Sequence, residues 1–436
     1  MLPDLDVSTP AVVLKLDPNV MHHGGLGAIR SLGRLGVPVY GVHEDRLAPA
    51  AGSRYLQGRW FWRPPAEDPE PLVAGLQVLA ERIGRPAVLI PTDDAGAIFL
   101  AEHGDPLRSV FRFPAPPPDL PRRVAGKLSL HRLCAEYGIS TPPALAPGSL
   151  GEARRFADRI GFPVVVKLAT PWRPARRATL RSTMLVGTPA ELERVYRESG
   201  REPGAELMLQ EFIPGGAGSD RFFHGYCDAR SVCRPAFTGI KDRSYPHHAG
   251  LTCLGRSANL PILRRTAVEL LARTGYRGIV DLDFRWNARD RTYQLLDFNP
   301  RLGAQFRLFR DQAGVDVVIA AYLDLTGRAV PAAAAVTGRR FVVENYDPIA
   351  AIGYRRVGEL DVRAWLSSVR GAEETAWFAR DDLLPFGLMC LRMGQRVLTR
   401  PLRCGRWRRA AGGPSYRPGR AARRRPPAQR GVDRDG

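Results

Sequence analysis

The stretch IVDLDFRWNARDRTYQLLDFNPR, residues 279–301, contains two runs in which apolar and polar residues alternate. Alternation with a period of two is typical of strands, and the polar residues between the runs predict a turn at 287–291. Residues two apart in a strand share a face of the sheet. Asp281 and Asp283 therefore point the same way from the first strand, and Asp297 and Asn299 share one face of the second.

If these strands pair as an antiparallel hairpin, Asp283 and Asp297 converge. Two carboxylates and an amide supply the hard oxygen ligands that Mg²⁺ binds when nucleotide phosphates complete its shell. The alternative is that the acids flank a solvated turn, and this suits Asp290. It suits Asp297 poorly, because Leu295, Leu296 and Phe298 surround that residue in the sequence and an unpaired carboxylate there would be costly.

Lysine is scarce in this chain. Of the 64 basic residues only four are lysines, at positions 15, 127, 167 and 241. A GC-rich coding bias explains an excess of arginine, so each lysine that remains is informative. Lysine presents a compact point charge that fits between phosphate oxygens where the wide fork of arginine does not. Lys167 ends an apolar run and must pair with a carboxylate or meet a phosphate, whereas we interpret Lys15 as incidental.

The remaining sequence predicts an α/β chain in four parts. Residues 1–115 predict a Rossmann-like layer, with a strand at 10–16, a glycine-rich turn at 22–27 and a strand at 86–92 whose carboxyl end carries Asp93 and Asp94. Residues 116–330 contain the hairpin, and the proline run at 113–118 separates them from the first part. Residues 331–400 predict a C-terminal α/β segment, and residues 401–436 a disordered tail rich in Arg, Pro and Gly.

The order of short motifs resembles the ATP-grasp superfamily of carboxylate–amine ligases, including the Rossmann-like pre-ATP-grasp domain that precedes it. The resemblance covers about residues 10–330. It is carried by an ordered set: Lys127, Pro-Val-Val-Val-Lys ending at Lys167, Gln-Glu-Phe-Ile-Pro-Gly at 210–215, Asp283, and Asp-Phe-Asn-Pro-Arg at 297–301. It implies an ATP-grasp fold of two α+β subdomains that clamp ATP between them.

The resemblance also implies roles for individual residues. Lys127 and Lys167 would contact the α- and β-phosphates of ATP. Glu211, Phe212 and Ile213 would form the strand that meets adenine, with Asp220 as a ribose partner where the family usually has Glu. Asp283, Asp297 and Asn299 would hold two Mg²⁺ ions, or Mn²⁺ in their place.

The implied reaction is the activation of a carboxylate as an acyl phosphate, followed by attack of an amine or thiol. Arg301 reaches the face that carries Asn299 and would neutralise the acyl phosphate, and Lys241 is a candidate for the γ-phosphate. Arg307 and Arg310 are either ligands of the substrate carboxylate or surface cations. His247 and His248, like His22 and His23, are either substrate ligands or polar loop residues.

The formal charge of +20 suggests nucleic acid, but it is partly local. Residues 401–436 hold eleven arginines against Asp433 and Asp435. No nucleic-acid-binding motif accompanies the charge, so we expect only non-specific contact through the tail. A nucleic-acid-binding protein and an inactive nucleotide-binding scaffold remain the alternatives to a ligase.

Small molecules are the expected partners, and a homodimer is left open. The six cysteines are scattered without metal or disulfide spacing, which favours a reduced, cytoplasmic setting. No apolar run approaches the roughly 18 residues of a membrane helix, so no membrane partner is expected.

Overall fold

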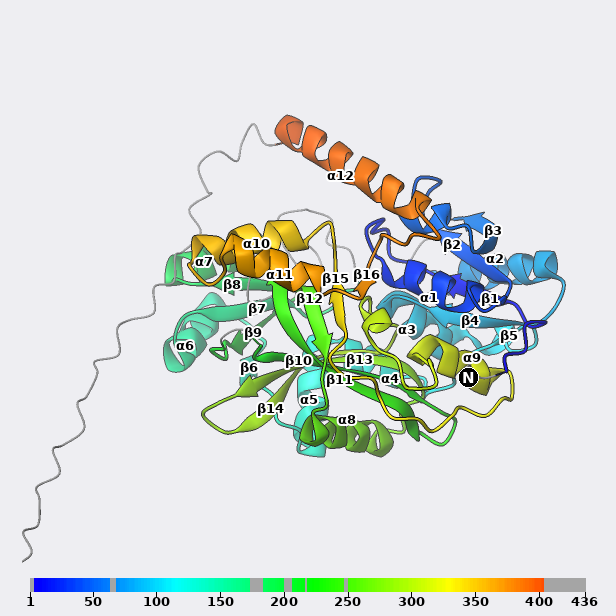
Figure 1. Ribbon diagram of the computed structural model, residues 1–436. Helices are drawn as coiled ribbons and strands as arrows, with labels where there is room; N and C mark the ends of the chain where they lie inside the picture. Colours follow the sequence, from blue (N-terminus) through cyan, green and yellow to red (C-terminus); the bar gives the residue numbers. More distant parts are fainter. Residues whose placement is uncertain are drawn as a thin grey trace, which may run out of the picture.

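The computed structural model describes residues 4–62, 68–172, 183–199, 206–215, 218–246 and 250–403. Three β-sheets with covering helices make up this part of the chain (Figure 1). The mixed α/β fold expected from the sequence is confirmed. His247, His248 and residues 404–436 lie outside the described residues, and so does almost all of the arginine-rich stretch 172–181, which we expect to form a basic loop.

The first sheet is parallel and has the strand order β3-β2-β1-β4-β5. Its strands are β1 (Ala11–Leu14), β2 (Val39–His43), β3 (Leu56–Phe61), β4 (Ala87–Pro91) and β5 (Phe111–Arg112). The accompanying helices are α1 (Gly24–Gly33), α2 (Pro69–Ile83) and α3 (Asp94–His103), with short 3-10 turns η1 (Pro49–Gly52) and η2 (Asp105–Leu107). Asp93 caps α3 by accepting a hydrogen bond from Gly96 N, so the carboxyl edge of β4 carries acids as the sequence predicts.

The second sheet has four strands in the order β6-β9-β7-β8, all antiparallel. They are β6 (Ala144–Leu145), β7 (Val164–Leu168), β8 (Thr183–Val186) and β9 (Leu207–Glu211). Helices α6 (Leu150–Ile160) and α7 (Pro189–Ser199) bury their apolar faces with β7 and β9 in one core cluster. Lys167 lies near the end of β7, in the middle of this sheet.

The third and largest sheet has the order β14-β13-β10-β11-β12-β15-β16. Its strands are β10 (Asp220–Cys227), β11 (Cys233–Tyr245), β12 (Leu251–Ser257), β13 (Gly278–Asn287), β14 (Thr292–Asn299), β15 (Arg340–Val342) and β16 (Glu374–Thr375). Helices of this region are α4 (Leu120–Ala125), α5 (Lys127–Tyr137), α8 (Pro261–Arg273), α9 (Val317–Leu325), α10 (Asp347–Arg356), α11 (Val362–Arg370) and α12 (Leu384–Arg403), with a 3-10 turn η3 (Phe306–Leu308). The segment 331–400 therefore adds two strands to the central sheet.

The glycine-rich segment at 22–27 differs from the turn predicted for it. Gly24, Gly25 and Gly27 lie inside α1, and another segment packs closely on Gly24 and Gly27. A Cβ at Gly27 would lie 2.7 Å from the Phe306 ring, and one at Gly24 would lie 3.2 Å from the Ala304 Cα. The start of α1 thus closes against the chain that follows the β13–β14 hairpin.

A shared core joins the parallel layer to the central sheet. Leu32 of α1, Phe222 of β10, Phe306, Val318 of α9 and Trp377 belong to one buried cluster. This continuity fixes the carboxyl edge of the parallel sheet relative to the hairpin. In the part of the chain that the structure describes, no helix is long and apolar enough to cross a membrane.

A buried ion pair fastens the C-terminal segment to α1. Arg30 Nε lies 2.9 Å from Asp382 Oδ2, and the two side chains are 4% and 1% exposed. Arg30 also donates to the carbonyl oxygens of Trp377 and Asp382, and Asp382 accepts a hydrogen bond from Ser53. One turn further along α1, Arg34 makes a similar contact with Asp381 at 2.8 Å, but these side chains are 29% and 43% exposed.

We predict that Arg30→Met lowers the free energy of unfolding by about 3 kcal/mol or more, because it leaves Asp382 buried without its counter-charge. Arg34→Met is the matched control, and we expect a loss below about 1 kcal/mol because solvent screens that pair. Urea denaturation followed by circular dichroism measures both. Equal losses for the two variants would contradict the assignment of Arg30 as the buried fastener.

Candidate active site

The predicted hairpin exists, and its register brings the acids together. β13 and β14 pair antiparallel with Asp283 opposite Asp297 and Asp281 opposite Asn299. The register shifts between Asp283 and Phe284, because β14 carries one extra residue, Leu296, at this point. Two carboxylates facing each other across adjacent strands repel, so this arrangement requires cations close by.

Two lysines from different elements meet the carboxylate of Asp297. Lys127 Nζ lies 2.7 Å and Lys167 Nζ 3.1 Å from Asp297 Oδ1. Lys167 also donates to the carbonyl oxygen of Leu296 at 3.0 Å. Lys127 is the first residue of α5, where a cation opposes the helix dipole. A side chain so placed needs an anionic partner, and Asp297 supplies it.

A third lysine holds the opposite carboxylate. Lys241 Nζ, from β11, lies 2.8 Å from Asp283 Oδ1. β11 is separated from β13 by β10, so this side chain reaches across one intervening strand. The three lysines that the sequence marks as informative therefore converge on the two opposed acids. Lys15 instead pairs with Glu44 at 3.0 Å, just beyond the carboxyl ends of β1 and β2 in the parallel sheet.

Burial and charge act in opposite directions on these groups. Burial alone would raise the pKa of Asp297, but Lys127 and Lys167 outweigh it and hold that pKa well below its usual range. Burial raises the pKa of Asp283, although Lys241 opposes this. Burial would also lower the pKa of Lys241, and Asp283 reverses that effect. Asp297 is accordingly ionised at neutral pH and is matched by two ammonium groups.

Arg301 lies between the hairpin and the parallel layer. Its Nη1 is 3.1 Å from Asp281 Oδ2, and its Nε is 3.4 Å from Asp94 Oδ1. Asp281 is only 5% exposed, whereas Asp283 and Asp297 are 22% and 26% exposed. Asp281 is thus an internal support for Arg301, while the other two acids face the opening.

His224 lies behind Asp281, with Nε2 3.2 Å from Asp281 Oδ1. The side chain is fully buried, and burial lowers its pKa to about 3, so the imidazole is neutral at physiological pH. Neither ring nitrogen forms a well-directed hydrogen bond within the described residues. A Cβ at Gly303 would lie 2.1 Å from this ring, so the chain beyond Arg301 passes directly over it.

Arg285 organises the segment predicted to meet adenine. It donates from Nε to Asp220 at 2.6 Å and from Nη1 to the carbonyl oxygen of Ile213 at 3.2 Å. Its guanidinium lies 5.5 Å from the centre of the Phe212 ring. Glu211, at the end of β9, lies 3.4 Å from Arg289. The four predicted residues are therefore brought together, with Asp220 held by an arginine.

Other predicted candidates lie elsewhere. Arg307 forms a double contact with Glu374 at 3.0 and 3.1 Å and donates to Ser31, so it links η3 to β16 and α1. Arg310 is exposed. His22 and His23 are half-buried just before α1, and desolvation lowers the pKa of both rings, that of His23 to about 4.

Four site residues had no assigned role at the level of sequence. Asp281 was visible in the alternation of β13, and Asp94 in its place after β4. Arg285 and His224 gave no signal, because one is among sixty arginines and the other is an isolated histidine in a strand. Their roles depend on which strands become neighbours.

The donor set of the hairpin fits a divalent cation that is shared with phosphates. Asp283, Asp297 and Asn299 offer oxygen ligands on one face and are partly open. No group of three or more His, Cys, Asp or Glu side chains within the described ranges is arranged to hold a metal ion. Two carboxylates and one amide thus make part of a coordination shell, as is usual for Mg²⁺ bound together with a nucleotide.

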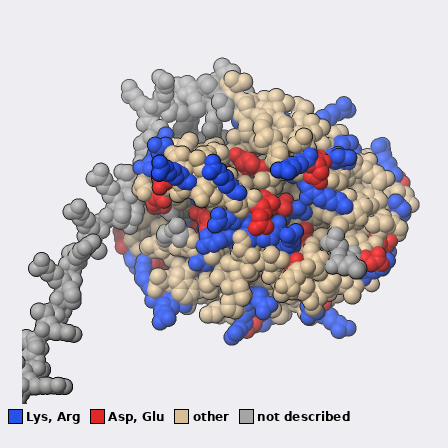
Figure 2. Space-filling view, viewed as in Figure 1, with Lys and Arg blue, Asp and Glu red and all other residues tan. Residues whose placement is uncertain are grey.

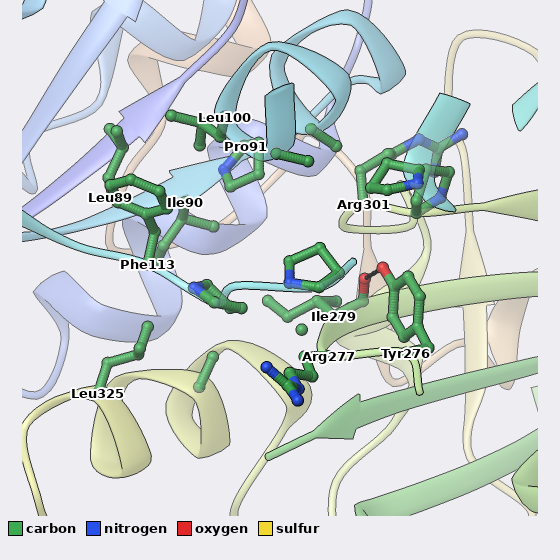
Figure 3. A pocket seen from close by; sticks show the side chains of 18 residues that line it. Leu89, Ile90, Pro91, Leu100, Phe113, Tyr276, Arg277, Ile279, Arg301 and Leu325 are labelled. Atoms are coloured by element: carbon green, nitrogen blue, oxygen red, sulfur yellow. Dashed lines mark hydrogen bonds between the residues drawn. The ribbon is translucent and has the colours of Figure 1, made fainter. Parts of the chain in front are cut away.

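An apolar cavity of about 50 Å³ lies beside the site, between β4, α3 and α9. Leu89, Leu100, Phe113 and Leu325 line it, and Arg301 stands at its edge (Figure 3). Its walls offer few polar groups, so we interpret it as a gap between the parallel layer and the central sheet. Figure 2 shows a hollow across the middle of one face of the molecule, in which both basic and acidic side chains are present.

Comparison with protein-family models gives no match. Among curated proteins, the chain is 24% identical over 281 residues to a D-aspartate ligase of Enterococcus faecium, which covers 60% of this chain and 64% of that enzyme. It is 25% identical over 205 residues to the large chain of carbamoyl phosphate synthase from Thermomicrobium roseum, covering 46% of this chain and 18% of the relative. The chain thus spans less than two thirds of both relatives.

Among solved structures, biotin carboxylase from Campylobacter jejuni, determined as a β,γ-ATP complex, superposes with a TM-score of 0.54. The superposition covers 76% of this chain and 74% of that chain at 14% sequence identity. At such low sequence identity, the superposition shows only that the two chains share a fold. The fold and these similarities show that the chain resembles ATP-grasp carboxylate–amine ligases, as the order of its site residues predicts.

Proposed function

We propose that this protein is an ATP-dependent ligase that activates a carboxylate as an acyl phosphate and joins it to an amine, releasing ADP and phosphate. The observation that carries the proposal is the convergence of Lys127 and Lys167 on Asp297, opposite Asp283 and Lys241. Three cations and two acids in one hollow form a site for a metal-bound triphosphate. The similarity to a D-aspartate ligase supports the reaction type.

We further propose four parts with distinct tasks. Residues 1–115 form a Rossmann-like pre-ATP-grasp domain, and residues 116–330 an ATP-grasp domain whose two subdomains contain the four-stranded and the large sheet. Residues 331–400 complete the large sheet, and residues 401–436 are an accessory tail. The nucleotide lies between the two sheets, because Lys167 comes from one and Asp297 from the other.

The lysines change partners when the nucleotide binds. Without nucleotide, Asp297 pairs with both Lys127 and Lys167. When ATP binds, oxygens of its α- and β-phosphates replace Asp297 as the partners of these ammonium groups. Asp283, Asp297 and Asn299 would then hold Mg²⁺, or Mn²⁺, which screens phosphate charge when bound. Backbone groups of Glu211, Phe212 and Ile213 meet adenine, and Asp220, oriented by Arg285, contacts the ribose.

The chemistry is a displacement at phosphorus followed by one at carbon. A carboxylate oxygen of the substrate attacks the γ-phosphorus, and the bond to the β–γ bridging oxygen breaks to release ADP. The amine nitrogen then attacks the acyl carbon, phosphate leaves, and the amine loses a proton. Lys241 stabilises the charge on the transferring phosphoryl group, and Arg301 that on the acyl phosphate.

The position of Arg301 determines where the acid binds. Asp281 of the hairpin contacts its guanidinium at 3.1 Å, and Asp94 of the parallel layer contacts it at 3.4 Å. Both parts of the fold therefore orient the guanidinium. The substrate carboxylate is expected beside it, at the carboxyl edge of β4. Both substrates are small molecules; their identity depends on loops around this edge, because a fold does not fix a substrate.

The alternatives are less well supported. A nucleic-acid-binding protein would present a surface of one sign, whereas acidic and basic side chains are mixed in the hollow of Figure 2. An inactive scaffold would not need Lys127, Lys167, Lys241 and Arg301 together with both opposed acids.

The direct test is a screen of amino acids and other small carboxylates, with and without amines, for ADP release. We expect turnover that requires both substrates. A carboxylate labelled with oxygen-18 should transfer one labelled oxygen to the released phosphate, because the acyl C–O bond breaks in the second step. ADP release without transfer of the label would contradict an acyl phosphate and leave only an ATPase.

We predict that Asp297→Asn lowers ADP production at least about a hundredfold, because the change removes a charged metal ligand while keeping the shape of the side chain. Asp290→Asn, in the exposed turn of the same hairpin, is the matched control and should retain activity. Circular dichroism establishes that both variants fold. A folded Asp297→Asn enzyme with normal magnesium-dependent turnover would remove the metal assignment.

We predict that Lys167→Arg weakens ATP binding although it conserves charge, because the guanidinium fork does not fit where one ammonium lies between Asp297 and a phosphate. Lys15→Arg is the control, since Lys15 is also a buried lysine paired with a carboxylate but lies in the parallel layer. Isothermal titration with ATP and Mg²⁺ measures the affinity. The argument from lysine scarcity fails if both variants bind ATP as the wild type does.

A further inference from the structure

Helix α12 has one face buried against the parallel layer. Met389 is 3% exposed, and Phe386 and Met393 pack beside it on the core shared with α1. Arg392 anchors the helix by donating to the carbonyl oxygen of Leu47 at 3.2 Å and by pairing with Asp45. The helix is thus attached along its side, and it extends away from the body of the molecule (Figure 1).

The opposite face of α12 carries three exposed leucines. Leu384, Leu391 and Leu398 are 61%, 48% and 74% exposed. Residues seven apart in a helix lie almost directly above one another, so the three form one line, here called the leucine stripe. With about 100° of rotation per residue, this line lies roughly opposite Met389 and Met393. An exposed apolar line of this kind marks an interaction surface.

The neighbourhood of the leucine stripe is open. A Cβ placed on Gly387 or Gly394, which flank the stripe, would meet no atom within 4 Å. At the start of the helix Leu384 lies close to Gly52 of η1, so the open part of the stripe consists of Leu391 and Leu398. The remaining chain is a poor cover, because residues 404–436 contain only Trp407, Tyr416 and Val432 as large apolar side chains.

The charge of this region is of one sign. From residue 383 to residue 432 the sequence contains no Asp or Glu. The same stretch contains thirteen arginines, at 392, 396, 400, 403, 406, 408, 409, 417, 420, 423, 424, 425 and 430. On α12, Arg392 lies on the flank between the buried face and the leucine stripe, where it pairs with Asp45, and Arg396 lies toward the buried face. The occupant of the stripe must therefore accept apolar side chains and provide negative charge.

These two requirements distinguish between the available partners. A second copy of the chain would bring two sets of thirteen arginines together without an acid to offset them. A nucleic acid offers negative charge but no apolar surface for leucines. An anionic lipid surface offers both, since leucines enter the acyl region while arginines meet the headgroups.

We propose that α12 and the basic sequence after it dock this protein on an anionic membrane surface, with the leucine stripe inserted and the helix lying in the plane of the interface. The helix does not span the bilayer, because its other long side is fixed to the protein. This inference does not rest on the ligase activity, and it revises the expectation of no membrane partner.

The test is co-sedimentation of the full-length protein with vesicles of phosphatidylcholine, with and without phosphatidylglycerol. We expect binding that requires phosphatidylglycerol. The double variant Leu391→Gln/Leu398→Gln should lower the partition coefficient at least about tenfold, because binding strength scales with buried apolar area. The matched control is Ile262→Gln, an equally exposed residue (66%) on α8, which Figure 1 shows at the opposite edge of the molecule.

A second variant separates the charge from the leucines. Deleting residues 405–436 should weaken binding to phosphatidylglycerol vesicles and to heparin alike. Adding salt to the wild-type protein should weaken both interactions in the same way. The deletion should leave ADP production unchanged, because the tail contains none of the site residues. The leucine variant, in contrast, should bind heparin as the wild type does.

Three results would overturn the proposal. The first is vesicle binding by the leucine variant equal to that of the wild type. The second is a parallel loss of heparin or DNA binding in the leucine variant, which would make the surface a nucleic-acid site. The third is a wild-type dimer in sedimentation analysis that the leucine variant converts to a monomer, which would make the stripe a contact between copies.

Discussion

The carboxylate of Asp297 is the constraint on which the site depends. It stands opposite Asp283 on the neighbouring strand, and without cations the two acids would repel each other in a partly buried place. Lys127 from α5 and Lys167 from β7 supply the charge. Because these lysines come from a helix and from a second sheet, the ion pairs hold three elements at one point. A nucleotide that takes over the lysines therefore acts where the two sheets meet.

A second junction lies on the other side of the hairpin. Arg301 is shared between Asp281 of the central sheet and Asp94 of the parallel layer, and His224 packs behind Asp281. The close approach of Phe306 to Gly27 fixes the same two parts by packing. In the proposed function the three lysines form the phosphate side of the site, and Arg301 forms the acyl side. This division agrees with a reaction in which a phosphoryl group passes from nucleotide to acid.

The relatives share the fold while their names describe different substrates, which range from D-aspartate to biotin. The features that carry the proposed chemistry lie on regular strands and helix ends, where packing fixes them. The features that would select an acid or an amine lie at the edge of the parallel sheet. The arginine-rich region beyond Asp382 is separate from both, and α12 connects it to the body through a few side chains.

The sequence determined the local elements and the identity of the reactive side chains. The alternation in 279–301 predicted the two strands of the hairpin, and lysine scarcity selected three cations that converge on its acids. Periodicity and composition are local properties of the chain, so they can be interpreted without knowing which distant segments are in contact. Only the tertiary structure decided that Asp281 supports Arg301, that Arg285 holds Asp220, that the glycines of α1 receive Phe306, and that one face of α12 stays uncovered. Each of these depends on which distant segments lie side by side, because burial and charge pairing are properties of the packed chain.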